Sequence, residues 1–422
     1  MREMKDSGIE WIGAIPQDWQ LSKIGSLYTQ RNEKVSDKDY QPLSVTMQGI
    51  LPQLATAAKT DDGDNRKLVR VGDFAINSRS DRRGSCGISP LDGSVSLINI
   101  ILTPRTAMHP GYYNWLFHTT LFADEFYKWG HGIVADLWTT RWQEMKSITV
   151  PVPEYAEQER IAAFLDAECA EIDAVLEKTR ASIEEYKKLK QAVITQAVTK
   201  GIHGDRPMKD SGIEWIGDIP AGVPISRVGL HFDIVLGKML CSAPVDDNYT
   251  LESYYCAADV HFEGLSNGEK KKMWFSPDEK EQYCVKSGDL LVVEGGAGAG
   301  GCAIAVSTDV PIYIQNSIMI VRSKGISNIR YLRYLLECLV KKGYIDVVCN
   351  KATIPHFTKD KLANVPFIVF SQSEQEEIAE YLNEKCAGID ALIVKKQQYL
   401  TEIENYKKSL IYEYVTGKKE VV

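Results

Sequence analysis

The chain of 422 residues lacks several features that assign a protein to a common class. No apolar run approaches the roughly 18 residues of a membrane span, so no membrane partner is predicted. The first ten residues, MREMKDSGIE, are too polar for a secretory signal, and we expect a cytoplasmic protein. The nine cysteines form no C-x-x-C pair, which predicts buried or half-buried thiols rather than a disulfide framework or a zinc site.

Motifs for common kinds of catalysis are also missing. The [ND]-P-P-[YF] and Pro-Cys motifs of DNA methyltransferases do not occur, and the seven histidines form no H-E-x-x-H pair. No G-K-[ST] phosphate loop follows any glycine-rich run. We therefore predict a binding protein that needs no cofactor and no metal.

One glycine-rich segment keeps an enzymatic alternative open. Gly296, Gly298 and Gly301 satisfy G-x-G-x-x-G after the apolar run 289–293, as in a dinucleotide site. The residues that follow have the pattern of a strand and a turn, whereas a dinucleotide site requires a helix there. A flexible hairpin is favoured. The alternative is a nucleotide- or S-adenosylmethionine-using enzyme centred on 295–301.

What the sequence does contain is an internal duplication. The ten residues MKDSGIEWIG occur at 4–13 and again at 208–217, an identity that chance does not produce. EQERIAAFLDAECAEIDAVL, beginning at Glu157, likewise matches EQEEIAEYLNEKCAGIDALI, beginning at Glu374. The chain therefore consists of an anchor, a variable block and a helix, followed by the same three elements again.

Each half ends in the pattern of a long helix. Over 158–200, apolar residues recur at steps of three, four or multiples of seven, and the second copy keeps this pattern. A narrow apolar stripe on a highly charged helix is typical of a coiled-coil seam, and each helix would be about 60 Å long. The matching stripes make the two helices natural partners, in either orientation. The first stripe comprises Ile161, Leu165, Ile172, Val175, Thr179, Ile183, Tyr186, Val193 and Ala197, and Leu392 is the counterpart of Val175 in the second.

The two variable blocks have a mixed pattern and are predicted to be α+β domains. Strand-like runs cover 94–102, 289–293 and 312–321, and helical stretches cover 112–128 and 329–341. The Gly-Asp pairs at 72–73 and 288–289 are predicted to turn into core strands, with glycine in a backbone conformation that other residues avoid. Asn99 is matched with Asn316.

The distribution of charge along the chain is compatible with a DNA-binding surface. The net charge is −8, but the excess acid lies largely in the helical segments, and the variable blocks are near neutral. Basic loop residues interleaved with Ser, Thr and Trp are the DNA-binding candidates, since Arg forks onto guanine and hydroxyls hold phosphate. They are Arg79, Arg82, Arg83, Thr140 and Arg141 in the first block, and Lys270, Lys271, Lys272, Lys351 and His356 in the second.

The arginine loop is the stronger signal, because three arginines within five residues repel one another unless an anion is nearby. Trp142 and Trp274, which lie beside other candidates, are predicted to belong to the core rather than to stack on bases.

The repeated D-S-G-I-E-W-I-G-x-I-P, the helix motifs E-Q-x-x-I-A-x-[FY]-L and I-D-A-[VL], and the ending V-T-K-G resemble the specificity subunit of type I restriction-modification systems. The resemblance spans the whole chain. It implies two α/β target-recognition domains that each read half of a split double-stranded DNA target. It also implies two long antiparallel coiled-coil helices that act as a ruler. The implied partners are two methylase subunits, with restriction subunits in the full complex, and the chain itself performs no chemistry.

The resulting fold class is α+β with a pseudo-twofold internal repeat. The expected divisions are anchor 1–13, target-recognition domain 14–150, helical spacer and linker 151–207, anchor 208–217, target-recognition domain 218–365, and helical spacer 366–422. The second anchor has no counterpart of Trp19, which predicts a difference in how the anchors pack. A coiled-coil adaptor that binds only proteins is the third interpretation.

Overall fold

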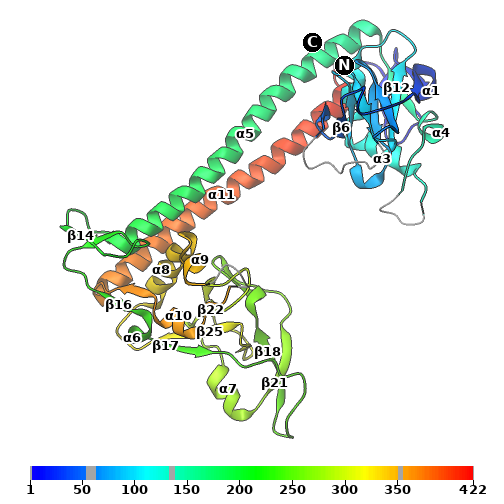
Figure 1. Ribbon diagram of the computed structural model, residues 1–422. Helices are drawn as coiled ribbons and strands as arrows, with labels where there is room; N and C mark the ends of the chain where they lie inside the picture. The colour runs from blue at the N-terminus through cyan, green and yellow to red at the C-terminus, as the bar shows by residue number, and fades with distance from the viewer. Residues whose placement is uncertain (1, 54–62, 133–137, 350–354, 422) are drawn as a thin grey trace. The chain divides into compact units, whose positions relative to one another are not determined.

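The computed structural model describes residues 2–53, 63–132, 138–349 and 355–421. The chain divides into two compact units, one formed by Met1–Ala181 with Gln397–Val422 and the other by Ser182–Lys396 (Figure 1). Each unit therefore contains one anchor, one variable block and a part of both long helices.

In the first unit, the variable block is built on an antiparallel sheet with the strand order β10-β9-β12-β4. Its strands are β4 (Tyr28–Arg31), β9 (Phe74–Asn77), β10 (Cys86–Ile88) and β12 (Asn99–Pro104). Helices α2 (Pro110–Phe117) and α3 (Thr120–Lys128) contribute aromatic rings to the core beside the sheet. The ring of Phe117 lies 4.6 Å from that of Phe74 and 4.7 Å from that of Phe122, so large aromatic side chains fill this core.

Smaller elements complete the first block. A sheet of order β11-β8-β5 and a β6-β7 hairpin lie beside it, and β3 pairs with β13 so that the two ends of the block meet. The bounds are β3 (Gln20–Lys23), α1 (Ile24–Leu27), β5 (Lys34–Val35), β6 (Leu43–Thr46), β7 (Gly49–Pro52), β8 (Arg66–Val69), β11 (Gly93–Val95), α4 (Trp142–Met145) and β13 (Thr149–Val152).

The second unit repeats this plan. Its main sheet has the order β17-β25-β22-β23, a second sheet has the order β21-β18-β24, and β16 pairs with β26. The strands are β16 (Ile225–Arg227), β17 (Phe232–Leu236), β18 (Thr250–Tyr255), β19 (Val260–His261), β20 (Gly264–Leu265), β21 (Lys271–Phe275), β22 (Leu290–Val293), β23 (Cys302–Ile304), β24 (Tyr313–Ile314), β25 (Ile318–Ser323) and β26 (Pro366–Ile368). The helices are α6 (Val228–His231), α7 (Pro277–Tyr283), α8 (Ile329–Lys341), α9 (Tyr344–Val348) and α10 (Lys359–Ala363).

The predicted elements are partly confirmed. The stretch 329–341 is α8, whereas 112–128 is two helices, because α2 ends at Phe117 and Thr119 caps α3 by accepting from the N–H of Phe122. The run 94–102 is not one strand: β11 pairs with β8 and β12 pairs with β9, and the chain turns between these partners. The run 312–321 divides into β24 and β25 for the same reason.

Both Gly-Asp turns are confirmed. Gly72 and Gly288 have φ values of +87° and +89°, and each precedes a buried core strand. The buried carboxylate of Asp73 accepts from Arg31 on β4, whereas that of Asp289 accepts from Arg322 on β25, at 2.7 Å in both cases. The aspartate pairing raises the pKa of both arginines. These aspartates are therefore structural, as predicted.

The matching of Asn99 with Asn316 was wrong by two positions. Asn99 is the first residue of β12 and pairs with Asn77, at the end of β9. In the second unit the corresponding pair is Ile318 with Val293. Asn316 lies in the turn before β25. The two asparagines share a residue type but not a structural position, so matching them misaligned the two blocks.

The long helices are α5 (Tyr155–Lys200) and α11 (Gln372–Val415), and within each unit their segments run antiparallel (Figure 1). In the first unit Lys407 pairs with Asp173 at 2.6 Å and Arg180 pairs with Glu404 at 2.6 Å. In the second unit Lys190 pairs with Asp390 at 2.7 Å. Exposed pairs of this kind contribute little free energy, but their order along the chain defines the orientation that the sequence pattern left open.

One predicted seam position was wrong. The side chain of Val175 is 39% exposed and its counterpart Leu392 is also exposed, whereas the neighbouring Leu176 is buried. The apolar stripe therefore passes through the adjacent residue at this turn. A straight α-helix does not repeat exactly every seven residues. Positions chosen at fixed heptad steps therefore move away from the helix–helix contact along a helix of this length.

The two anchors form equivalent hairpins despite the missing tryptophan. Lys5 pairs with Ile15 between β1 (Met4–Asp6) and β2 (Ala14–Pro16), and Lys209 pairs with Ile219 between β14 (Met208–Asp210) and β15 (Asp218–Pro220). The predicted difference lies in the side chains. The buried Trp19 donates its indole N–H to Glu157 at 2.9 Å, a contact for which the second unit has no tryptophan.

The glutamine of the duplicated Glu-Gln pair near the start of each long helix has the same role in both units. Gln158 accepts from the backbone N–H of His109, before α2, and Gln375 accepts from that of Asn328, before α8. Each amide thus fixes a variable block to the helix of its own half. All nine cysteines are free and buried or half-buried, and no helix in the described ranges is long and apolar enough to cross a membrane.

Candidate nucleic-acid interface

In the first unit, three loop segments meet beyond the end of β9. The backbone N–H of Ser78 donates to the carbonyl of Ile98 at 3.3 Å, and the N–H of Thr140 donates to the carbonyl of Ser78 at 3.0 Å. The N–H of Ser80 donates to the carbonyl of Trp138 at 2.9 Å. These bonds hold one continuous surface of loops. We call the segments 78–85, 96–98 and 138–141 the first loop cluster.

The same pair of hydrogen bonds recurs in the second unit, beyond the end of β22. The N–H of Glu294 donates to the carbonyl of Ser317 at 2.8 Å, and the N–H of Phe357 donates to the carbonyl of Glu294 at 2.6 Å. We call the segments 294–301, 315–317 and 355–357 the second loop cluster. Glu294 therefore stands where Ser78 stands in the first cluster. The backbone hydrogen bonds beyond the ends of β9 and β22 are the same, but the side chains at these positions differ.

The arginine loop lies in the first cluster, but its charge is partly balanced within the protein. Arg79 lies 3.3 Å from Asp81, and Arg83 lies 2.5 Å from Asp124 with its guanidinium 5.7 Å from the ring of Tyr127. Arg82 is 68% exposed, and its closest carboxylate, that of Asp81, is 3.9 Å away. Aspartates of the protein itself thus supply part of the negative charge that three neighbouring arginines need nearby. Arg82 is the arginine most available to a ligand.

Thr140 requires a correction. Its side chain is fully buried and its hydroxyl donates to the carbonyl of Phe126 at 2.9 Å, so it supports the cluster and presents no hydroxyl at the surface. Arg141 is exposed and immediately precedes α4. Trp142 packs against the hydrophobic core, as predicted.

Lys270, like Thr140, supports the structure of its own block and does not present a free group to a ligand. Its ammonium group donates to the Asp259 carboxylate at 3.0 Å and lies 5.2 Å from the ring of Tyr255. Burial alone would raise the pKa of Asp259, but hydrogen bonds from Cys256 and Lys270 outweigh it and lower that pKa. This lysine therefore holds the loop before β21 and is not a free cation.

The other second-block candidates differ in position. Lys271 and Lys272 are exposed on β21, at the edge of its sheet, and Trp274 on the same strand is half-buried. Lys351 lies outside the described residues. His356 belongs to the second loop cluster, where its backbone bridges to Gly295 and its Nδ1 lies 3.2 Å from Oε2 of Glu294.

The glycine-rich segment does not have the geometry of a dinucleotide site. It joins the antiparallel strands β22 and β23, whereas a dinucleotide fingerprint joins a strand to a helix. Gly296 and Gly300 have φ values of +88° and +82°. The segment is therefore the hairpin that the sequence favoured, and it occupies the place of the arginine loop in the other unit.

Sequence reasoning missed three residues of the clusters. Ile98 and Trp138 are exposed apolar side chains in the first cluster, and Glu294 is the acidic member of the second. A search for basic residues does not find them. Alignment of the two blocks through their Gly-Asp turns would have paired Ser78 with Glu294 and directed attention to this position.

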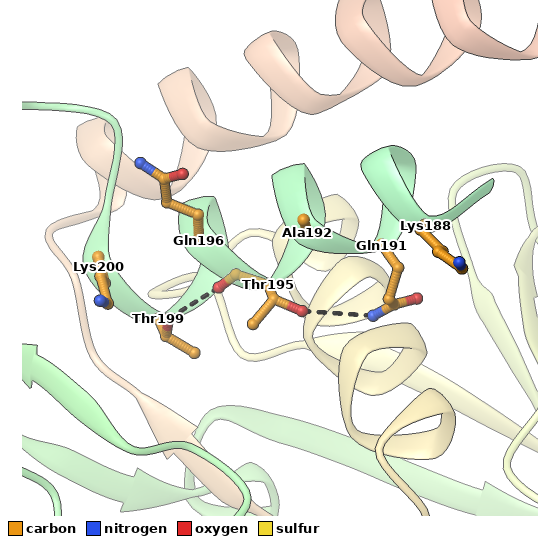
Figure 2. Close-up of a pocket in the computed structure, with 7 residues that line it drawn as sticks. All are labelled: Lys188, Gln191, Ala192, Thr195, Gln196, Thr199 and Lys200. Carbon is orange, nitrogen blue, oxygen red and sulfur yellow. Dashed lines mark hydrogen bonds between the residues drawn. The ribbon is translucent and has the colours of Figure 1, made fainter. Parts of the chain in front are cut away.

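A shallow hollow of about 660 Å³ lies elsewhere, on one face of α5 within the second unit (Figure 2). Figure 2 shows Gln191 donating to the hydroxyl of Thr195, and Thr199 donating to the backbone of Thr195. Its lining consists of Lys188, Gln191, Ala192, Thr195, Gln196, Thr199 and Lys200. This set contains no carboxylate, imidazole or thiol, and it offers no acid-base pair for catalysis.

Comparison with known proteins agrees with the resemblance. Residues 263–402 match the family model described as Type I restriction modification DNA specificity domain. The specificity subunit of the type I restriction enzyme MjaVIII from Methanocaldococcus jannaschii is 24% identical over 433 residues, which cover 96% of this chain and 94% of that protein. The family match lies within the second half of the chain, and the curated relative matches along nearly the whole chain.

Two solved structures share the fold. A chain from a study of complex assembly and conformational transition of the type I R-M system has a TM-score of 0.74 at 16% identity, covering 96% of this chain and 99% of that one. The HsdS subunit from Thermoanaerobacter tengcongensis has a TM-score of 0.56 at 17% identity, covering 96% and 98%. Together these matches confirm the resemblance to type I restriction-modification specificity subunits that the repeated motifs indicated.

Proposed function

We propose that the chain is the sequence-specific DNA-recognition subunit of a type I restriction-modification complex and has no catalytic activity of its own. Its target-recognition domains, at 14–150 and 218–365, each read one half of a bipartite double-stranded target. One observation carries the proposal: the two loop clusters share the same backbone hydrogen bonds but differ in side chains, with Ser78 in one and Glu294 in the other. Equivalent scaffolds that carry different side chains at corresponding positions are what two different half-sites require.

The basic candidate residues would position DNA. Arg79, Arg82, Arg83 and Arg141 would contact the first half-site, and Lys271, Lys272, Lys351 and His356 the second. Such contacts neutralise phosphates and release counterions, so binding would weaken as salt rises. The apolar Ile98 and Trp138 would add contact area beside the arginines.

The helix pair would set the distance between the half-sites and bind two methylase subunits, with restriction subunits joining the full complex in the cytoplasm. B-form DNA repeats about every 10 base pairs, or about 34 Å, so two readers on one face need a fixed separation. Helices with ion pairs between them hold a separation better than a loop does.

The test is co-expression with the methylase subunit encoded beside this chain, followed by mapping of N6-methyladenine across the host genome. We expect methylation at one split motif, and its loss when the chain is deleted. Exchanging residues 14–150 for the corresponding block of another specificity subunit should change one half-site only. A change in both half-sites would contradict the modular assignment, and the absence of any motif that depends on the chain would contradict the function.

A further inference from the structure

We propose that Glu294 reads a C·G base pair in the second half-site by accepting a hydrogen bond from the cytosine amino group, and that His356 is the positioning residue that orients its carboxylate. The inference rests on the proposed function and adds to it a base and the residue that selects it. His356 is one of the basic candidates from the sequence, but neither the repeated motifs nor the basic residues point to Glu294.

The two side chains come from separate segments and meet at the surface. Nδ1 of His356 lies 3.2 Å from Oε2 of Glu294, and the imidazole is 58% exposed whereas the carboxylate is 17% exposed. Backbone bonds fix both residues, since Phe357 donates to the carbonyl of Glu294 and Gly296 donates to that of Pro355. The carboxylate is therefore held in one orientation before any ligand arrives, as a reading group must be.

Gly295 allows this arrangement. A Cβ atom at this position would lie 3.1 Å from Nδ1 of His356 and 3.6 Å from the carbonyl oxygen of Pro355. A larger residue would therefore push the imidazole away from the carboxylate. The close approach of His356 therefore explains why position 295 of the glycine-rich segment is a glycine.

The first unit indicates that the fold does not need this pair. Ser78 occupies the place of Glu294 and makes the same backbone bonds, and Thr139 occupies the place of His356 in the bridge to the loop. The loops form with these smaller side chains. A carboxylate and an imidazole at these positions therefore add chemistry that the backbone geometry does not require.

The chemistry of a carboxylate limits which base it can read. Phosphates repel it, so it is tolerated in a DNA interface where a base donates to it, and the major groove offers only the amino groups of cytosine and adenine as donors. Beside its amino group adenine presents the acceptor N7, which would repel the second carboxylate oxygen. Cytosine presents only a C–H there. Cytosine is therefore the favoured partner.

Glutamine at this position has a different preference. Its amide accepts through oxygen and donates through nitrogen, which matches the adjacent amino group and N7 of adenine. Glu294→Gln should therefore admit A·T at the pair where the wild-type chain requires C·G. We expect preference at this pair to change by about tenfold to a hundredfold, while the first half-site stays the same.

The experiment maps N6-methyladenine for the wild-type chain, four variants of the pair and one control variant, each co-expressed with the methylase subunit. The half-site read by the second domain is identified as the one that survives exchange of residues 14–150. Glu294→Gln should admit A·T, and Glu294→Ser, which copies the first unit, should relax the same position. His356→Ala should weaken selection there, and His356→Asn should restore it, because the asparagine amide nitrogen can replace Nδ1 as donor. The matched control is Glu281→Gln, an exposed glutamate on α7 that should leave the motif unchanged.

The outcomes separate this inference from the function on which it rests. A wild-type second half-site without a C·G pair, or an unchanged motif for both Glu294 variants, overturns the inference and leaves the recognition function standing. Uniform loss of methylation at every site, without rescue by His356→Asn, indicates a purely structural pair and overturns it as well. If the wild-type chain directs no motif, the proposed function itself fails.

Discussion

The hydroxyl of Tyr112 donates to the backbone carbonyl of Val415 at 2.7 Å, although the two residues are 303 positions apart. In the second unit Tyr331 donates in the same way to the carbonyl of Val198, at 3.0 Å. Val198 and Val415 are corresponding residues near the ends of α5 and α11. Each variable block is therefore hydrogen-bonded to the end of the long helix from the other half of the repeat. Neither half of the repeat makes this contact by itself.

Removing one of these hydroxyls should destabilise the unit that contains it. In Tyr112→Phe the buried carbonyl of Val415 loses its donor, and we expect the free energy of unfolding to fall by about 1–3 kcal/mol. The midpoint of urea denaturation measures the change. Tyr399→Phe, an exposed tyrosine on α11, is the control and should leave the free energy of unfolding within about 0.5 kcal/mol of the wild type. Equal midpoints for Tyr112→Phe and the control would show that the bond contributes nothing.

The two Gly-Asp turns should be sensitive to any side chain. Gly72→Ala and Gly288→Ala place a Cβ in the left-handed region, at an expected cost of about 1–2 kcal/mol each. Nothing lies within 4 Å of the added atoms, so the cost is conformational and not steric. Gly222 is also open to a Cβ but does not have a positive φ, and Gly222→Ala should be neutral or slightly stabilising. A similar loss of stability in all three variants, measured by thermal denaturation, would contradict this argument.

Arg82 should contribute to DNA affinity without selecting sequence. Because it is the most exposed arginine of its loop, Arg82→Ala should weaken binding to cognate and non-cognate duplexes alike and lower the salt slope by about one. Fluorescence anisotropy of labelled duplexes at several salt concentrations, with the chain bound to its methylase subunits, measures both effects. Arg160→Ala, an exposed arginine on α5, provides the matched loss of charge. An equal effect of the two variants would mean that the arginine loop has no special role.

The length of the helix pair should determine the spacing of the target. Seven residues inserted after Ala181 in α5 and before Gln397 in α11, where the two units divide, add about 10 Å of helix, close to the rise of three base pairs. We expect methylated motifs with a longer non-specific gap and unchanged half-sites. Methylation at the original spacing would exclude a ruler.

Glu337 should make the stability of the second unit depend on pH. Burial raises the pKa of this carboxyl above its ordinary value of 4.5, although Arg333 lies 3.1 Å away and opposes the shift. A group with a raised folded-state pKa stabilises the protein below its unfolded pKa, and that stability is lost as the pH rises through the folded pKa. The wild type should therefore lose stability relative to Glu337→Gln as the pH rises above about 4.5. Denaturation midpoints that change in parallel across this range would contradict the prediction.

The sequence predicted the framework well because local rules govern it. Ten repeated residues, a long helical pattern and two Gly-Asp turns depend on the order of neighbouring residues, and α8 was predicted to its end residues. Strands were predicted less well. The run 94–102 has a strand-like composition along its whole length, and only the choice of pairing partner decides where β11 ends and β12 begins.

The candidate site was predicted from residue types and their spacing, and residue type does not report burial. Thr140 and Lys270 have the residue types of DNA contacts, yet one lies in the core and the other is bound to Asp259. Glu294 has the opposite charge to the residues sought, so no search for basic loops finds it. Its position became visible when the hydrogen bonds of the two units were compared.

The sequence by itself determined that this protein has two similar halves, each with a repeated anchor segment, an α+β block and a long amphipathic helix. Those properties are encoded by periodicity and by identity between segments. Only the tertiary structure decided that Tyr112 bonds to Val415, that the helices are antiparallel within each unit, and that Glu294 lies against His356. Such contacts join residues distant in the chain, and their geometry depends on how the sheets and helices pack rather than on any local pattern.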